Sequence, residues 1–138
     1  MTGRIVVTTT QLVVRHLADD DPFTPGPWRD LVVEHRVELR TLGSLGVRVE
    51  PDEPTVEVRV ALDEPARGQG YATEALAAVV DHALVERGFV RVVAFAPSAD
   101  ERTQHLLEWV GLRAVAADGD DLVYLRRASE SQPQPPSK

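Results

Sequence analysis

The stretch DEPARGQGYATEAL, residues 63–76, follows an alternating apolar run and opens into a helical pattern. It places Gly68 and Gly70 one residue apart, directly after Arg67. Glycine loses the most backbone freedom on folding, so this pair indicates a turn that needs either bare backbone or positive φ. A helix beginning at Tyr71 would present unpaired N–H groups and the positive end of its dipole. Two interpretations follow: a pyrophosphate seat with Arg67 as an added cation, or a tight strand-to-helix turn.

The flanking runs have the periods of a strand and a helix. In residues 55–62 three valines alternate with polar or small residues, which is the period of a strand. Residues 72–88 predict an amphipathic helix that a glycine ends, and residues 90–96 predict a buried strand. The apolar side chains of the helix at four-residue spacing are Leu76, Val80 and Leu84. Strand, helix and strand together predict a parallel crossover.

The rest of the chain is expected to add antiparallel strands to this parallel pair. Further strands are expected at residues 11–17, 28–39, 42–50, 113–117 and 121–127, and a second helix at 101–110. Ser98 has the capping-box spacing and is the expected N-cap of that helix. The order β-β-β-β-α-β-α-β-β describes an α/β fold with a mixed sheet. We expect one domain over residues 1–127 and a disordered polar tail over 128–138.

Composition excludes several classes of function. The net charge is −7 and no cysteine is present, so neither a basic nucleic-acid surface nor a disulfide or cysteine metal site is expected. The four histidines show no metal-binding spacing, and we expect no metal. No apolar run is long enough for a membrane span and no signal peptide is recognised, which favours a soluble cytoplasmic protein.

The segment RGQGYATEAL resembles motif A of the GNAT superfamily of N-acetyltransferases, whose pattern is Arg/Gln-x-x-Gly-x-Gly/Ala. The strand before it, VEVRVALDEP, and the helix end HLLEWVGL are similar to the corresponding segments of the family. The TEAL ending is similar to the branch that acetylates the N-termini of ribosomal proteins. The resemblance covers roughly residues 42–127. It implies the GNAT-like acyl-CoA N-acyltransferase fold.

The resemblance also implies acetyl-CoA as co-substrate. Family members hold the pyrophosphate with the backbone of the motif-A turn and lay the pantetheine between the two splayed strands, here residues 55–62 and 90–96. A backbone N–H near Leu62 would polarise the thioester carbonyl. The family's Asn-x-x-Ser at the next helix becomes Asp100-x-x-Thr103. The implied pyrophosphate seat is Arg67, Gly68, Gln69, Gly70, Tyr71, Ala72 and Thr73.

The catalytic groups match the family less well. Glu57 occupies the position where the ribosomal-type branch often has glutamate, and it is the candidate base, acting directly or through water. The alternative is a solvated outward glutamate on a two-sided strand. Many members protonate the departing thiolate with a tyrosine where this chain has Leu107, which donates no proton. Tyr124, on a late strand, is expected to be structural rather than a substitute acid.

The largest departure is upstream, between the first two expected strands. Family members usually place two helices there to wall the acceptor site, whereas this chain has ADDDPFTPGP. We expect transfer of acetyl to a primary amine, either a small amine or a peptide N-terminus, at an open site or one completed by a second copy in a homodimer. The alternative is a non-catalytic acyl-CoA-binding module with a sensing or regulatory role. Trp28, beside the shortened segment, is expected in the core or at a dimer contact.

Overall fold

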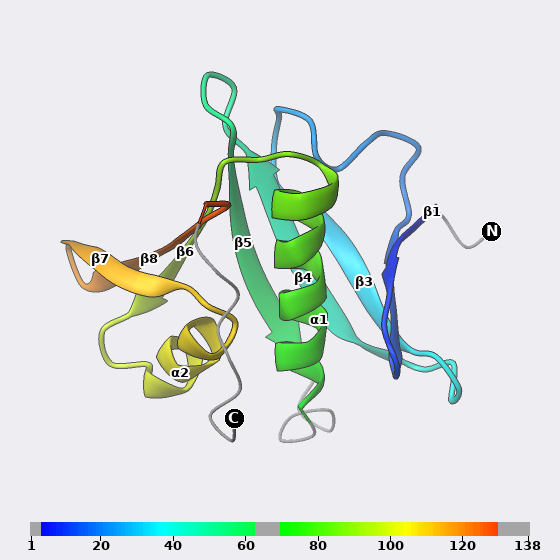
Figure 1. The fold of residues 1–138 in the computed structure, drawn as a ribbon. Coiled ribbons are helices and arrows are strands. Elements are labelled where there is room, and N and C mark those ends of the chain that lie inside the picture. The colour runs from blue at the N-terminus through cyan, green and yellow to red at the C-terminus, as the bar shows by residue number, and fades with distance from the viewer. Residues whose placement is uncertain (1–3, 63–69, 130–138) are drawn as a thin grey trace.

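The computed structural model describes residues 4–62 and 70–129. They form one eight-stranded sheet in the order β1-β2-β3-β4-β5-β6-β8-β7 (Figure 1). Only β5 and β6 pair in parallel, and every other neighbouring pair is antiparallel. The strands are β1 Arg4–Thr8, β2 Leu12–His16, β3 Arg29–His35, β4 Thr41–Val49, β5 Thr55–Leu62, β6 Arg91–Pro97, β7 Arg113–Asp118 and β8 Asp121–Arg127. The mixed α/β sheet expected from the sequence is confirmed.

Two helices cover one face of this sheet (Figure 1). The first, α1, spans Tyr71–Asp81 and continues into the π-helical turn η2, His82–Glu86. Gly88, at φ 75°, follows the end of this segment, as the sequence predicts. The second, α2, spans Glu101–Trp109. No helix in the described ranges is long and apolar enough to cross a bilayer.

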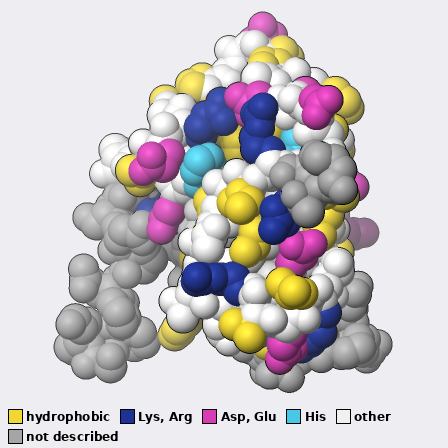
Figure 2. Space-filling view, turned by 90° about the vertical axis from the view of Figure 1, so that its right-hand side faces the viewer, with side chains coloured by type: hydrophobic (Ala, Val, Ile, Leu, Met, Phe, Trp, Pro, Cys, Tyr) yellow, Lys and Arg dark blue, Asp and Glu magenta, His cyan; other side chains and the backbone are white. Residues whose placement is uncertain are grey.

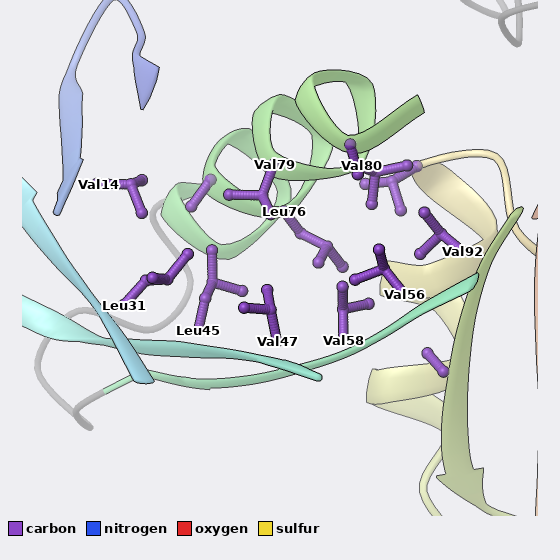
Figure 3. Packing of buried hydrophobic residues seen from close by; sticks show 14 of the residues in the cluster. Val14, Leu31, Leu45, Val47, Val56, Val58, Leu76, Val79, Val80 and Val92 are labelled. Carbon is purple, nitrogen blue, oxygen red and sulfur yellow. The ribbon is translucent and has the colours of Figure 1, made fainter. Parts of the chain in front are cut away.

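The core lies between α1 and the sheet. Leu45 and Val47 of β4 and Val56 and Val58 of β5 point toward α1 and contact its apolar face (Figure 3). Leu76, Val80 and Leu84 are buried, so the helical face predicted from the sequence is confirmed. Burying side chains of this size stabilises the fold by about 1.5–3 kcal/mol each, before the entropy of ordering is counted.

The opposite face of the sheet carries no helix in the described part of the chain (Figure 1). Because side chains alternate along a strand, the neighbours of the core residues in β4 and β5 project there. Arg48, Glu57 and Arg59 are among them. We call this face of the sheet the open face. Seen from the β1 edge, basic and acidic side chains of the molecule are interspersed rather than gathered by sign (Figure 2).

Several local expectations are wrong. Strand β1 was not expected, because its exposed edge gives Arg4–Thr8 no clean alternation of buried and exposed residues. Ser98 does not cap α2; Asp100 does, because its carboxylate accepts the Thr103 N–H at 3.1 Å. Trp109 is 60% exposed, because it lies two residues after buried Leu107 and therefore about 200° further around the helix axis.

Candidate functional site

The parallel strands β5 and β6 pair over only the first part of their length and then diverge. Thr55–Glu57 pairs with Arg91–Val93, and no pairing continues beyond Glu57 and Val93 in the described residues. Strand β5 nevertheless runs on to Leu62, held by β4, and β6 runs on to Pro97, held by β8. The splayed strands expected from the family resemblance are therefore present. Backbone groups of β5 that point into the gap have no strand partner there.

A cavity of about 170 Å³ lies where the strands diverge. Its lining combines residues of the helix face, including Leu76 and Leu107, with Arg59 and Phe95 from the other side of the two strands. The gap therefore connects the helix face to the open face. The cavity is lined by Val58, Arg59, Val60, Leu76, Ala94, Phe95, Pro97, Thr103 and Leu107. Arg59 is the one charged residue of this set, and Thr103 brings a hydroxyl.

The helix after the glycine turn begins as the sequence predicts. Gly70 adopts φ 81° and ψ 3°, a left-handed conformation, and no side chain caps α1. A Cβ at this position would meet no heavy atom of the described residues within 4 Å, so those residues leave the space in front of the helix open. The positive φ agrees with the interpretation as a tight turn, and the pyrophosphate seat stays a prediction. Arg67, Gly68 and Gln69 lie outside the described residues.

Residues 71–73, the first turn of α1, face this end of the site with backbone N–H groups rather than with side chains. Tyr71 is 7% exposed, and its ring meets that of His35 edge-on at 5.7 Å between centroids. Ala72 and Thr73 are half-buried in the first turn. The first helical turn contributes N–H groups and the helix dipole to this end of the site.

Glu74 is a residue whose role the sequence did not reveal. Its carboxylate accepts hydrogen bonds from the Thr9 hydroxyl and, at 2.9 Å and 2.8 Å, from the backbone and side-chain N–H groups of Gln11. Burial acts to raise the pKa of Glu74, but these hydrogen bonds outweigh it and hold the pKa below its ordinary value. Glu74 thus fixes the start of α1 against the turn between β1 and β2. The contact spans more than sixty residues, and no local pattern encodes it.

Asp100 and Thr103 contact each other rather than forming a shared wall of the cavity. The Asp100 carboxylate accepts the Thr103 hydroxyl at 2.7 Å and the Thr103 N–H at 3.1 Å. These hydrogen bonds lower the pKa of Asp100. Thr103 also lines the cavity, whereas Asp100 does not. Their first role is to begin α2 at the edge of the cavity.

Glu57 is the last residue of β5 that pairs with β6, and we call the point where the two strands separate the fork. Its carboxylate is 14% exposed and accepts a hydrogen bond of 2.5 Å from Arg48 on the neighbouring strand. It is neither a fully solvated outward glutamate nor an unpaired one. The guanidinium groups of Arg48 and Arg59 both lie over the Trp28 ring, at 5.1 Å and 4.1 Å from its centroid. Trp28 therefore belongs to the open face; of the two alternatives, a place in the core is wrong, and a dimer contact stays a prediction.

Leu107 and Tyr124 lie on the helix side of the fork. Leu107 is 3% exposed and lines the cavity, so an apolar side chain fills the position at which many family members carry the proton donor. Tyr124 is buried, and its hydroxyl donates to Glu108 at 3.3 Å. Burial raises the pKa of Tyr124, and the Glu108 carboxylate raises it further. Tyr124 is not among the residues that line the cavity, which favours the structural role.

A family model and several solved structures are similar to this chain. A family model described as an acetyltransferase (GNAT) domain matches residues 9–113. A GNAT-family acetyltransferase from Bacillus anthracis superposes with a TM-score of 0.69 at 18% identity, covering 73% of this chain and 67% of that one. Spermidine N-acetyltransferase from Vibrio cholerae, solved with CoA and spermine, gives a TM-score of 0.73 at 13% identity over 88% of this chain and 98% of that one.

A third solved structure, RimJ of Mycobacterium smegmatis with CoA-disulfide, gives a TM-score of 0.65 at 21% identity. The match covers 75% of this chain and 54% of that one. At these identities the superpositions show the fold alone. A search of curated protein sequences finds no significant match. The family model nevertheless spans most of the chain, residues 9–113, and the chain belongs to the GNAT acetyltransferase family.

Proposed function

We propose that this chain binds acetyl-CoA and transfers its acetyl group directly to a primary amine. The observation that carries the proposal is the divergence of β5 and β6 beyond Glu57, because it opens a cavity that Leu76 of α1 also lines. We further propose that residues 1–127 act as one domain.

The residues around the gap fit an acyl-CoA. The open space at Gly70 and the N–H groups of Tyr71, Ala72 and Thr73 suit a pyrophosphate, with Arg67, Gly68 and Gln69 completing the seat. The mostly apolar walls between the strands suit the pantetheine chain, and the unpaired backbone of β5 suits its amides. When bound, acetyl-CoA supplies the thioester whose acetyl group is transferred.

The reaction needs a neutral amine and a polarised carbonyl. The amine nitrogen forms a bond to the acetyl carbon, the carbon–sulfur bond breaks with its electron pair going to sulfur, and the amine loses a proton. Glu57 takes that proton, and water supplies one to the thiolate, a fair leaving group because a thiol has a pKa near 8.5. A β5 backbone N–H near Leu62 polarises the carbonyl. Glu57 and Leu62 are separated by about 16 Å of strand, so Glu57 acts through a chain of water molecules.

Calorimetric titration with acetyl-CoA tests the seat, comparing the wild type with Gly70→Glu. The new carboxylate should repel and displace the pyrophosphate and lower the affinity at least about a hundredfold. Gly88→Glu is the matched control, because Gly88 also has positive φ, at 75°, and open surroundings, but lies at the far end of the same helical segment. Equal losses in both variants would mean that strain, rather than the seat, weakens binding. A wild type that binds no acetyl-CoA would refute the proposal.

A second function is favoured by one observation. In the cavity lining, Leu107 replaces a proton donor, and the described lining includes no carboxylate. A module that binds acyl-CoA without transferring it, in a sensing or regulatory role, needs neither group. Binding of acetyl-CoA with no release of thiol across a panel of amines and peptides would support the module, and thiol release with any amine would refute it.

A third arrangement is a homodimer in which a second copy of the chain covers the open face and completes the acceptor site. Turnover per chain would then rise with protein concentration as the dimer forms. Sedimentation at the concentrations of the assay distinguishes this case, and a monomeric mass in an active sample would exclude it.

A further inference from the structure

Arg59 occupies an unusual place in this site. It lines the cavity between β5 and β6, it projects to the open face, and it lies two residues from Glu57 on the same strand. Its guanidinium carbon lies 4.1 Å from the centroid of the Trp28 ring. Below it, Gly46 leaves no room for a side chain: a Cβ there would lie 2.7 Å from Nε and 2.8 Å from Cγ of Arg59. Arg59 is therefore held in place from two sides.

The contacts that hold Arg59 leave its N–H groups available. Stacking uses the flat face of a guanidinium, while its hydrogen-bond donors point outward in the plane. Within the described part of the chain, the nearest carboxylate is that of Asp30, at 3.7 Å, which is longer than a hydrogen bond. The Arg59 side chain remains 55% exposed. A planar guanidinium that is held in place and has unused N–H donors can bind a carboxylate in a bidentate manner.

The neighbouring charges favour an anionic partner as well. Arg48 already neutralises Glu57 through its hydrogen bond of 2.5 Å. Arg59 therefore leaves this part of the open face with a positive charge that Asp30 offsets only partly. A polyamine would be repelled here, whereas a substrate with a carboxylate would be attracted.

Arg59 lies between the proposed base and the proposed acetyl position on β5: it is two residues from Glu57 and three residues, about 10 Å, from Leu62. Residues two apart on a strand point to the same side, about 7 Å from each other. A molecule that places a carboxylate on Arg59 can therefore place an amino group two or three bonds away within reach of Glu57 and its waters. Resting on the function proposed above, we propose that the acceptor is a small amino carboxylate, such as a free amino acid, and that Arg59 binds its carboxylate while the amine is acetylated.

The test uses the full-length protein, acetyl-CoA and a thiol-release assay. Each common amino acid is compared with its own carboxamide, which keeps the shape and removes the charge, and spermidine is added as a polycation. We expect at least one amino acid to react with a kcat/KM about tenfold or more above that of its amide. The amine of the amide is the less basic, so this preference would not arise from amine ionisation. Titration of the same ligands into CoA-saturated protein gives a second readout that needs no turnover.

Variants assign the preference to Arg59. In Arg59→Gln, the kcat/KM of the preferred amino acid should fall about 10- to 100-fold through KM, whereas that of its amide should change little. Arg59→Lys should recover only part of the loss, because lysine keeps the charge and loses the planar N–H donors. Arg15→Gln, which removes an arginine on β2 bonded to Glu34 at 2.8 Å, is the matched control and should leave the preference unchanged.

The outcomes separate this inference from the function on which it rests. If acetyl-CoA does not bind, the proposed function itself fails. If acetyl-CoA binds but amino acids and amides react or bind equally, the carboxylate plays no part and the inference is overturned. Preference for spermidine, or for a peptide with an acidic first residue over any free amino acid, would also overturn it. A preference for the acid that survives Arg59→Gln would remove Arg59 from the site.

Discussion

Arg48 donates a hydrogen bond of 2.5 Å to Glu57 at the last residue of β5 that pairs with β6. The pair therefore fixes the only carboxylate that we place at the fork, on the side of the sheet away from α1. Arg48 also rests against Trp28, so base, arginine and indole form one connected unit. This unit lies on the open face, which carries no helix in the described part of the chain.

Replacing Glu57 by glutamine should remove the base and preserve the fold. We expect kcat to fall by about 10² or more, because general base catalysis typically contributes 10²–10⁴. Glu34→Gln is the matched control, since Glu34 also pairs with an arginine, Arg15, across neighbouring strands of the open face. Steady-state rates with saturating acetyl-CoA and circular dichroism measure both effects. Equal rates in Glu57→Gln and the wild type would show that another group takes the proton.

Leu107 offers a test of the missing proton donor. Leu107→Tyr would bring a phenol to the cavity, and we expect kcat about tenfold above that of Leu107→Phe, which has the same ring without the hydroxyl. The comparison with phenylalanine removes the cost of added volume, which both variants share. Similar rates in the two variants would show that departure of the thiolate does not limit turnover. Single-turnover measurements would separate this step from product release.

The parts of the site that the sequence reveals are those set by local pattern. Periodicity and turn chemistry predict β5, α1 and the positive φ of Gly70, because strand period, helix period and glycine freedom act over a few residues. Contacts between distant segments were not predictable in this way. Glu74 reaching Thr9 and Arg59 stacking on Trp28 depend on which strands become neighbours, and that is decided by the whole sheet. The cap of α2 was mistaken because Ser98 and Asp100 are both good capping residues and only the backbone path selects one.

Gly46 should tolerate no side chain. A Cβ there would also come within 3.1 Å of Cε3 of Trp28, so Gly46→Ala must push Arg59 and the indole away from the sheet. We expect the free energy of unfolding to fall by about 1–3 kcal/mol and the fluorescence of Trp28 to shift. Trp109→Phe provides the background, because exposed Trp109 would otherwise contribute to the emission. Unchanged urea denaturation and emission in Gly46→Ala would show that Arg59 moves at no cost and is not held by this glycine.

The segment between β2 and β3 is bound to the end of the α1–η2 segment by an ion pair. Arg87 donates to both carboxylate oxygens of Asp21, at 2.9 Å and 2.6 Å, and lies over the ring of Phe23. The Arg87 hydrogen bonds lower the pKa of Asp21 from 3.8 to about 2. Because the folded-state pKa is depressed, the pair stabilises the fold above about pH 4, and this stabilisation is lost as the pH falls toward 2.

Asp21→Asn should therefore destabilise the protein in a pH-dependent manner. Both side chains of the pair are 33% exposed, so solvent screening reduces the expected loss at pH 7 to about 1 kcal/mol. Urea denaturation at several pH values from 7 to 2 should show the gap between wild type and variant closing below pH 4. In an Arg87→Ala background the Asp21→Asn change should cost much less at neutral pH, because the partner is already gone. A gap that stays constant down to pH 2 would mean that the loss in Asp21→Asn does not come from the charge of Asp21, because asparagine can still accept the Phe23 N–H that Asp21 accepts at 2.9 Å.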